Sequence, residues 1–402
     1  MKWNFIYILF ISLPLANIIH ESGELSEFLG GHSPGSSYDN WVSHVTEGIA
    51  SDGFNDYGPD WLDVQTTGFG NYNKLEFGDP ILSYWEDIFS SFILGDTTLV
   101  DSLLQDSIES FYYELVVFED TVYNQIFHII REQLDTNFID LNQSDNDLDD
   151  VVGSFRNGWG MYIINPQATR EQVVIQVPHP CDDFIAPYIA IDIFLETNAF
   201  AFMINGAGRE VLWTEVGNYS NSKSLSDPSR YPNTIFQKFQ EVAVHPLIGI
   251  NPHWPLVFAI HSFDNESHED RKSIIVAAGG QNSFTTKPIR DITDDHFDII
   301  NFTSEYPIDE GQFGNTNSLH VTDYYEVFYD DHCVFDNGET EFPITLATEL
   351  KGPSNGVQMV DLQNLTSNFS VYEPWIHIEL DEKPMLFDSN GISNDSVYQN
   401  GS

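Results

Sequence analysis

The sequence predicts an α/β protein in which a central β-sheet is flanked by helices. Between about residues 151 and 263, strand-like and helix-like patterns alternate along the chain, which is the order typical of α/β sheets. The chain has 402 residues, of which 41% are hydrophobic and 30 are Phe, so it can bury a substantial core. Because chemical groups gather at the carboxyl ends of the strands in such sheets, these ends are where we look for a site.

Residues 1–16 have the build of a secretory signal peptide. Lys2 precedes an apolar run of about a dozen residues, and Ala16 lies near a plausible cleavage point. Pro14 stands where a signal peptidase prefers a small residue, so a retained anchor and another cleavage point stay open as alternatives. We therefore expect a secreted or periplasmic protein with no membrane attachment beyond this segment.

Two further segments are expected before the α/β region. Residues 17–79 are rich in Gly, Ser, Asn and aromatic residues, which predicts an irregular lead-in. Residues 80–150 contain the runs ILSYWEDIFSSFIL, DSLLQDSIESFYYELVVFED and YNQIFHIIREQLD, whose spacing predicts two or three helices that pack on the core.

Residues 151–385 are expected to form the α/β domain, and residues 386–402 a flexible tail. WGMYIINP and EQVVIQVP resemble paired strands with short period-two runs. The expected elements that follow are a helix in FIAPYIAIDIFLETN, a strand in AFAFMING, a helix in TIFQKFQEVAVH, and strands in PLVFAIHSF, SIIVAAG, YYEVFYD and WIHIELD.

The charge balance narrows the range of partners. The chain has 62 acidic and 15 basic residues, a formal net charge of -47, which repels nucleic-acid phosphates and anionic lipid headgroups. We therefore expect no nucleic-acid partner and interpret the acidic excess as a solvated surface. The oligomeric state is not predicted by any feature of the sequence.

The strongest candidate site begins where the strand VIQVPHPCDD ends. His179 is followed by Asp182 and Asp183, and a second strand, PLVFAIHSF, also closes on a histidine, His261. Two histidines and one carboxylate form a three-ligand zinc site with an open position. The alternative is that one of the aspartates caps the next helix while His179 bonds to a neighbouring loop.

Two other strand ends carry groups suited to hydrolysis. Arg209 follows AFAFMINGAG, and a guanidinium can bind a substrate carboxylate or a developing oxyanion. In WIHIELD, Glu379 alternates with the apolar residues and would serve as general base and then as proton donor to a leaving amine. Asp227 and Arg230 in DPSRYPNTIFQKFQEV are candidates for substrate binding, because a loop that sets specificity could lie ahead of the predicted helix. The alternative is that this segment starts the helix, with Asn233 as its cap.

These blocks together resemble the carboxypeptidase-like and N-formylglutamate-amidohydrolase-like zinc hydrolases, especially secreted bacterial members that read VPHP followed by an aspartate. VPHPCDD resembles the first metal-ligand segment, INGAGRE the arginine loop, FAIHSF the second histidine strand, and WIHIELD the strand with the catalytic glutamate. The order of the blocks also matches, over roughly residues 155–385. The resemblance implies a mixed central sheet of the zinc carboxypeptidase, phosphorylase/hydrolase-like kind.

The resemblance also implies a set of metal ligands. His179, one of the two aspartates and His261 would bind Zn²⁺. Relatives with the pattern HPxxD favour Asp183, whereas the HxxE pattern of carboxypeptidases would select Asp182. Both assignments stay open here.

The remaining roles follow from the same resemblance. Arg209 would orient the substrate and Glu379 would be the general base. Cys181 lies between His179 and the aspartates, and three roles remain open for it: a thiolate ligand, a disulfide partner of Cys333, or a small buried side chain.

Two classes of function are consistent with these observations. The first is a secreted zinc-dependent hydrolase that cleaves an amide bond in a peptide, a γ-glutamyl compound or an N-acyl amino acid; an esterase or a deacetylase would share the same site. The second is a non-catalytic secreted acidic protein with a binding or surface role, stabilised by calcium at its acidic loops. Convergence of the predicted strand ends at one place would favour the enzyme.

Overall fold

The computed structural model describes the following parts of the chain: residues 18–30, 42, 45, 72–106, 112–133, 139–140, 151–152, 157–180, 183, 185–208, 213–214, 223–229, 231–248, 255–263, 274–277 and 375–381. Its helices are α1 (Leu25–Gly30), α3 (Pro80–Ile93), α4 (Thr97–Asp106), α5 (Ala186–Thr197), α6 (Ile235–Val244) and the short 3₁₀ helix η2 (His245–Leu247).

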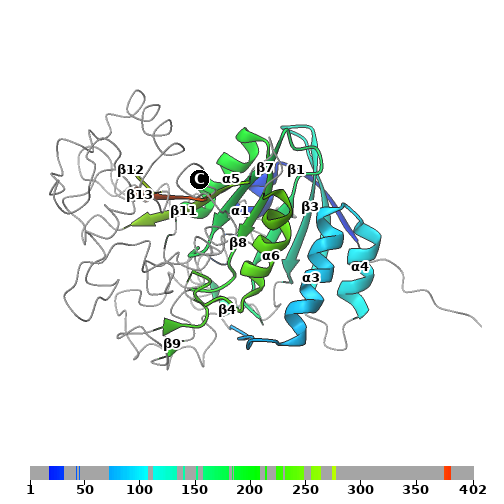
Figure 1. The fold of residues 1–402 in the computed structure, drawn as a ribbon. Helices are drawn as coiled ribbons and strands as arrows, with labels where there is room; N and C mark the ends of the chain where they lie inside the picture. The colour runs from blue at the N-terminus through cyan, green and yellow to red at the C-terminus, as the bar shows by residue number, and fades with distance from the viewer. Residues whose placement is uncertain are drawn as a thin grey trace, which may run out of the picture.

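Nine strands form one mixed sheet. In Figure 1 its labelled strands extend from β12 and β13 on the left to β1 and β3 on the right. In spatial order they are β1 (Ile19–Gly23), β2 (Tyr113–Asp120), β3 (Gln125–Glu132), β6 (Met161–Ile164), β8 (Ala199–Ile204), β7 (Arg170–Val177), β11 (Leu256–Phe263), β13 (Trp375–Asp381) and β12 (Ile274–Ala277). Two separate pairs are formed by β4 (Ile139–Asp140) with β5 (Val151–Val152), and by β9 (Trp213–Thr214) with β10 (Lys223–Ser224). The α/β class predicted from the sequence is therefore confirmed.

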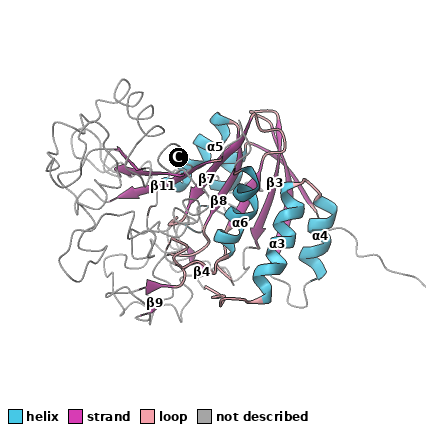
Figure 2. Ribbon diagram, viewed as in Figure 1, coloured by secondary structure: helices cyan, strands magenta, loops and turns pink. Residues whose placement is uncertain are grey.

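Helices cover both faces of the sheet, as Figure 2 shows. Alternate residues of each central strand point to opposite faces, and in β7 Ile175 packs in the cluster with α1 and α5, whereas Val174 packs in the cluster with α3 and α6. In β8, Phe202 and Met203 divide in the same way. The strands are apolar on both faces because each face is buried under a helical layer.

The helix starts follow local capping rules. Asp79 caps α3 by accepting a hydrogen bond from Ile81 N at 2.9 Å, and Pro80 occupies the first turn. Thr234 caps α6, since its hydroxyl accepts from Gln237 N at 3.0 Å. These caps fix where the two helices of one layer begin.

Four neighbouring strands, β8, β7, β11 and β13, run parallel to one another. Their carboxyl ends therefore lie at the same edge of the sheet. This edge brings together segments that are far apart in the sequence. They are the segments after residues 177 and 204 and those near residues 261 and 379. This edge is the place where an α/β sheet collects functional groups.

The helical prediction for residues 80–150 is wrong in part. Two helices, α3 and α4, form as expected, but the apolar runs after them are the strands β2 and β3, which pair as an antiparallel hairpin. In β2, Leu115 and Tyr113 pack towards one helical layer, while Val116 and Phe118 pack towards the other. Burial on both faces leaves apolar residues three apart, and this spacing mimics a helix.

Two other expectations need correction. The sequence predicts that WGMYIINP and EQVVIQVP are paired strands, but β8 lies between β6 and β7 and pairs with both. The lead-in, residues 17–79, also contains regular structure, since β1 extends the sheet by pairing with β2 and α1 follows it. The predicted signal peptide, the tail after residue 385 and the strand YYEVFYD lie outside the described residues.

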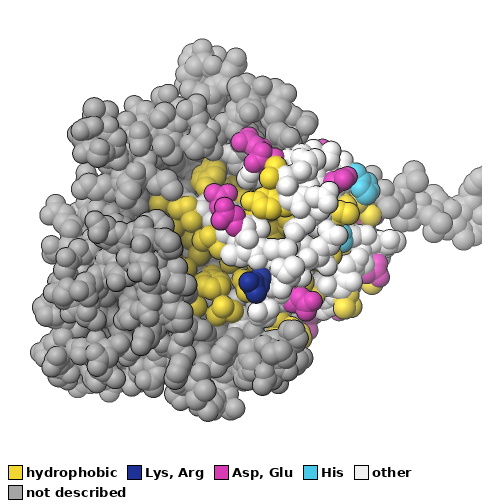
Figure 3. Space-filling model, turned by 90° about the horizontal axis from the view of Figure 1, so that it is seen from above, with side chains coloured by type: hydrophobic (Ala, Val, Ile, Leu, Met, Phe, Trp, Pro, Cys, Tyr) yellow, Lys and Arg dark blue, Asp and Glu magenta, His cyan; other side chains and the backbone are white. Residues whose placement is uncertain are grey.

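The part of the lead-in next to α3 is tied to the core by side chains. Tyr231, after the loop that contains Asp227, donates its hydroxyl to Leu75 O at 2.6 Å, and Trp159 Nε1 donates to Asn73 O at 2.6 Å. The described surface above the sheet carries Asp and Glu side chains at several separate places among mainly uncharged atoms (Figure 3). On the described face in this view, the acidic side chains are therefore scattered rather than gathered in one patch.

Phe89 offers a test of the layer formed by α3 and α6. Its ring is fully buried and lies 4.8 Å from the ring of Tyr162 and 4.9 Å from that of Phe239. Phe89→Ala should lower the free energy of unfolding by about 3–5 kcal/mol, because it removes buried area and leaves a cavity. Chemical denaturation measures the change, with Leu94→Ala, at a side chain 85% exposed, as the control. Equal stability of the two variants would contradict this packing.

Candidate metal centre

His179 is held in place by the turn that ends β7. The strand stops at Val177, and Pro178 and Pro180 flank the histidine. Asp183 N donates to His179 O at 2.8 Å, and Ala186 N donates to Asp183 O at 2.8 Å, where α5 begins. One turn therefore brings the Asp183 carboxylate back beside the His179 imidazole. Both residues are buried.

His261 reaches the same place from the neighbouring strand. β11 pairs with β7 in parallel, with Ala259 registered against Gln176. His261 is two residues beyond Ala259, just as Pro178 is two residues beyond Gln176. The two imidazole rings lie with their centroids 4.9 Å apart, in an edge-on arrangement. Strand pairing therefore brings His261 to the end of β7, and the turn that follows β7 carries His179.

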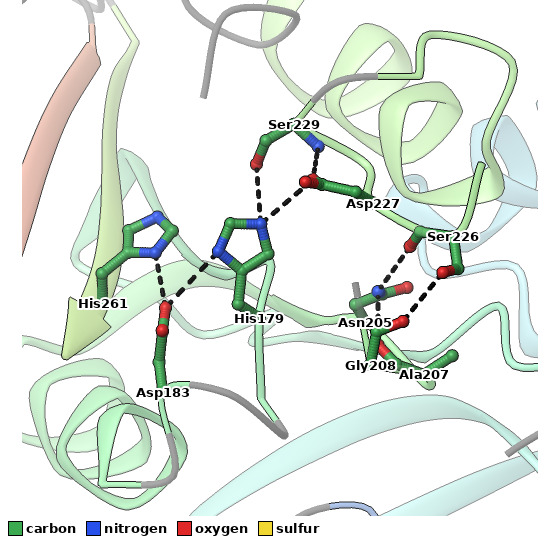
Figure 4. A network of polar contacts seen from close by, with 9 residues as sticks. All are labelled: His179, Asp183, Asn205, Ala207, Gly208, Ser226, Asp227, Ser229 and His261. Atoms are coloured by element: carbon green, nitrogen blue, oxygen red, sulfur yellow. Dashed lines mark hydrogen bonds and ion pairs between the residues drawn. The ribbon is translucent and has the colours of Figure 1, made fainter. Parts of the chain in front are cut away.

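The Asp183 carboxylate lies between the two histidines, as Figure 4 shows. Its Oδ2 is 2.6 Å from His261 Nδ1 and 3.5 Å from His179 Nδ1. One ligand atom from each of the three residues lies within 4.8 Å of the others, so the group could hold a metal ion. This confirms that His179, Asp183 and His261 converge. The helix-capping alternative does not apply to Asp183, because the N-cap residue of α5 is Ile185 and no side chain bonds there.

A second carboxylate lies behind His179. Asp227 is fully buried, and its Oδ1 accepts a hydrogen bond from His179 Nε2 at 3.0 Å and another from Ser229 N at 2.8 Å. Ser229 Oγ is 3.4 Å from the same ring nitrogen. A carboxylate on one ring nitrogen fixes the tautomer and directs the other nitrogen to a metal. Nδ1 of His179 is the nitrogen that faces Asp183 and His261.

The neighbouring charges shift the pKa values of His179 and Asp183. Burial lowers the pKa of His179, but the charge of Asp227 and the bonds to Asp183 and Asp227 outweigh it and raise this pKa to about 10. Burial would also raise the pKa of Asp183, but the neighbouring His261 and His179 hold it well below its usual range. The carboxylate is therefore ionised, which is the form that binds a metal.

The donor set fits zinc or a similar divalent ion. Two imidazole nitrogens and one carboxylate oxygen are the protein ligands of many catalytic zinc sites. Bonds of about 2.0–2.1 Å in a tetrahedral arrangement put ligand atoms roughly 3.3 Å apart, and the spacing between His179 Nδ1 and Asp183 Oδ2 is 3.5 Å. The His261 to Asp183 spacing of 2.6 Å would need to open by a small side-chain rotation.

The other predicted residues are placed as follows. Glu379 lies on β13, and its Cα is the registered partner of the Cα of His261. Asp227, predicted to bind substrate, instead lies behind His179, where its carboxylate contacts the imidazole. Asp182, Arg209 and Arg230 lie outside the described residues, as do Cys181 and Cys333.

Sequence reasoning singled out Asp227 but missed its contact with His179. It also missed Asn205 and Ser226, which follow β8 and precede Asp227 and form buried hydrogen bonds beside the site. The available signals were weak: Asn205 is the first polar residue after an apolar strand, and DPS has the pattern of a turn in which an aspartate accepts from the second residue after it.

Comparison of the chain with protein-family models, with curated proteins and with solved structures gives no match. Among the helices that the structure describes, none combines the length and the apolar character needed to cross a membrane.

The charges around His179 predict a pH dependence of stability in protein freed of metal by a chelator. Because folding raises the pKa of His179 to about 10, its charged form stabilises the fold fully below the unfolded pKa of about 6.5, and this contribution is lost as pH rises towards 10. Asp227→Asn removes the largest cause of the raised pKa. The difference in unfolding free energy between wild type and this variant should therefore narrow from pH 6.5 to pH 10 in denaturant titrations; a constant difference would contradict the charge pairing.

Proposed function

We propose that the protein is a secreted zinc-dependent hydrolase that cleaves an amide bond in a peptide or an amino-acid conjugate. The observation that carries the proposal is the buried convergence of His179, Asp183 and His261 from two strands and the turn that leads into α5. Burying two imidazoles and a carboxylate in one place costs solvation free energy, so an arrangement of this kind is a candidate functional site.

Zinc held by such a ligand set supplies a Lewis acid and lowers the pKa of water. The chain's own residues would hold the metal and orient its ligands. Asp227 keeps a proton on Nε2 of His179, so that the Nδ1 lone pair is directed to the metal. Asp183 supplies the negative ligand.

Glu379 is the residue that we propose as general base. Two observations support this role: the sequence resemblance of WIHIELD, and the register that pairs Glu379 with His261 on adjacent parallel strands. A carboxylate there would accept a proton from the attacking water and deliver it to the leaving amine nitrogen. We propose that Arg209 binds a carboxylate of the substrate, because in the sequence it comes directly after Gly208, the last described residue of the segment that follows β8.

The finer fold assignment belongs to the same proposal. A carboxypeptidase-like sheet is supported by the parallel strands β8, β7, β11 and β13 and by the succession of ligand pair, arginine, histidine and glutamate along the chain. Secretion is supported by the pattern of residues 1–16. The net charge of -47 supports a small-molecule or peptide substrate over nucleic acid.

Metal content tests the proposal directly. Purified protein should contain close to one zinc per chain by elemental mass spectrometry, and His179→Ala and His261→Ala should each lose most of it, because each removes one of three ligands. His20→Ala is the matched control, since this histidine is exposed on β1. Absence of zinc, or zinc that survives both ligand changes, would contradict the proposal and favour a binding protein.

Glu379→Gln separates metal binding from catalysis. The variant should retain zinc, while kcat on its best amide substrate falls by about 10²–10⁴-fold, the usual contribution of a general base. The substrate panel contains peptides with free carboxyl ends, γ-glutamyl compounds, N-acyl amino acids and simple esters. Glu171→Gln, at an exposed position at the start of β7, should keep full activity. Full activity of Glu379→Gln would exclude Glu379 as the base.

A further inference from the structure

Asn205 connects the strand that precedes His179 with the segment that carries Asp227. It is the first residue after β8, it is only 2% exposed, and its backbone N–H donates to Val177 O at 3.0 Å. Val177 is the last residue of β7 and lies two positions before His179. The backbone of Asn205 is therefore fixed to the strand that delivers the first histidine.

The side chain of Asn205 makes the second connection. Its Nδ2 donates to Ala207 O at 2.9 Å and to Ser226 O at 3.1 Å. Ser226 is fully buried, and its hydroxyl donates to Gly208 O at 2.8 Å. Two hydrogen bonds therefore join residues 205–208 to Ser226, as seen on the right of Figure 4.

Asp227 comes directly after Ser226. The peptide bond that links them begins with the carbonyl that Asn205 holds, so the position of this carbonyl sets where the Asp227 backbone begins. Asp227 Oδ1 then contacts His179 Nε2 at 3.0 Å. A shift of an ångström in the segment would lengthen this hydrogen bond beyond its useful range.

The loop that carries Asn205 is itself firmly seated. A Cβ atom on Gly206 would lie 2.6 Å from Gly160 N and 2.9 Å from Gly158 C, so the two loops pack backbone against backbone. Such contacts leave little space for residues 205–208 to move. The backbone that carries Asn205 is therefore held in place while its side chain donates to Ser226 O.

From this geometry we propose that Asn205 is a positioning residue of the metal centre. Its hydrogen bonds go to Val177, Ala207 and Ser226 rather than to the metal ligands. By holding the carbonyl of Ser226, it would keep Asp227 where its carboxylate orients the imidazole of His179. The inference rests on the proposed function in one respect, namely that the centre binds zinc. Mutation of a group that orients a metal ligand typically lowers the affinity for the metal 10–100-fold.

The test measures zinc affinity by competition with a chromophoric chelator, with unfolding by denaturant recorded for each variant. Asn205→Ala should bind zinc about tenfold more weakly than wild type. Asn165→Ala is the matched control, because Asn165 is the first residue after β6, is 1% exposed, and also donates two side-chain hydrogen bonds, to Gln125 and Asn198. Since β6 runs antiparallel to β8, this asparagine lies at the opposite edge of the sheet. The Asn165→Ala variant should be less stable than wild type but bind zinc with wild-type affinity.

A double-mutant cycle shows whether Asn205 acts through Asp227. In the Asp227→Asn background the contact with His179 is already weakened, so Asn205→Ala should change zinc affinity by less than about twofold. A loss of about tenfold in both backgrounds, or an equal loss in Asn165→Ala, would overturn the inference. If Asn205→Ala does not fold, Ser226→Ala serves in its place, since it removes the hydrogen bond from the Ser226 hydroxyl to Gly208 O and should show the same dependence on Asp227.

The outcomes for the two proposals are distinct. Wild-type protein that binds no zinc would overturn the proposed function, and with it the positioning role. Wild-type protein that binds zinc, together with an Asn205→Ala variant of unchanged affinity, would overturn the positioning role alone.

Discussion

The candidate metal centre depends on the parallel pairing of β7 with β11. His179 and His261 are 82 positions apart in numbering, and nothing local in the chain brings them together. The register that sets Ala259 beside Gln176 places both histidines at one edge of the sheet. The pairing is stabilised by apolar side chains on both faces, such as Val174 and Ile175. The packing of the core and the geometry of the site are thus consequences of the same strand order.

The site also shows how a protein tolerates charges in its interior. His179, Asp183 and Asp227 are all buried, and an isolated ion there would be costly. The imidazole lies between the two carboxylates, so each negative group has a positive neighbour. These attractions between opposite charges raise the pKa of His179 and lower the pKa of Asp183. A metal ion would replace the proton on one side of the ring and leave the other side unchanged.

The sequence predicts the parts of the site that lie at strand ends, because an apolar run that stops at a polar group is visible without a structure. This pattern identifies His179, His261 and the pair Asp182 and Asp183, but it does not choose between the two aspartates. The hairpin of β2 and β3 was missed because both of its faces are buried, which removes the alternation that identifies a strand. The contact of Asp227 with His179 was missed for another reason: it spans 48 positions and depends on how a loop folds over the sheet edge.

The two carboxylates beside His179 have different tasks because their surroundings differ. Asp183 lies in the turn before α5, and its oxygen faces both histidine Nδ1 atoms, so it shares the space in which a metal would be held. Asp227 lies on the far side of the ring, and Ser229 N donates to the oxygen that contacts the imidazole. That hydrogen bond anchors the carboxylate on the loop side. Asp183 is therefore the carboxylate that would bind the metal, and Asp227 is the carboxylate that orients His179. Of the two, only Asp227 depends on the position of residues 205–208.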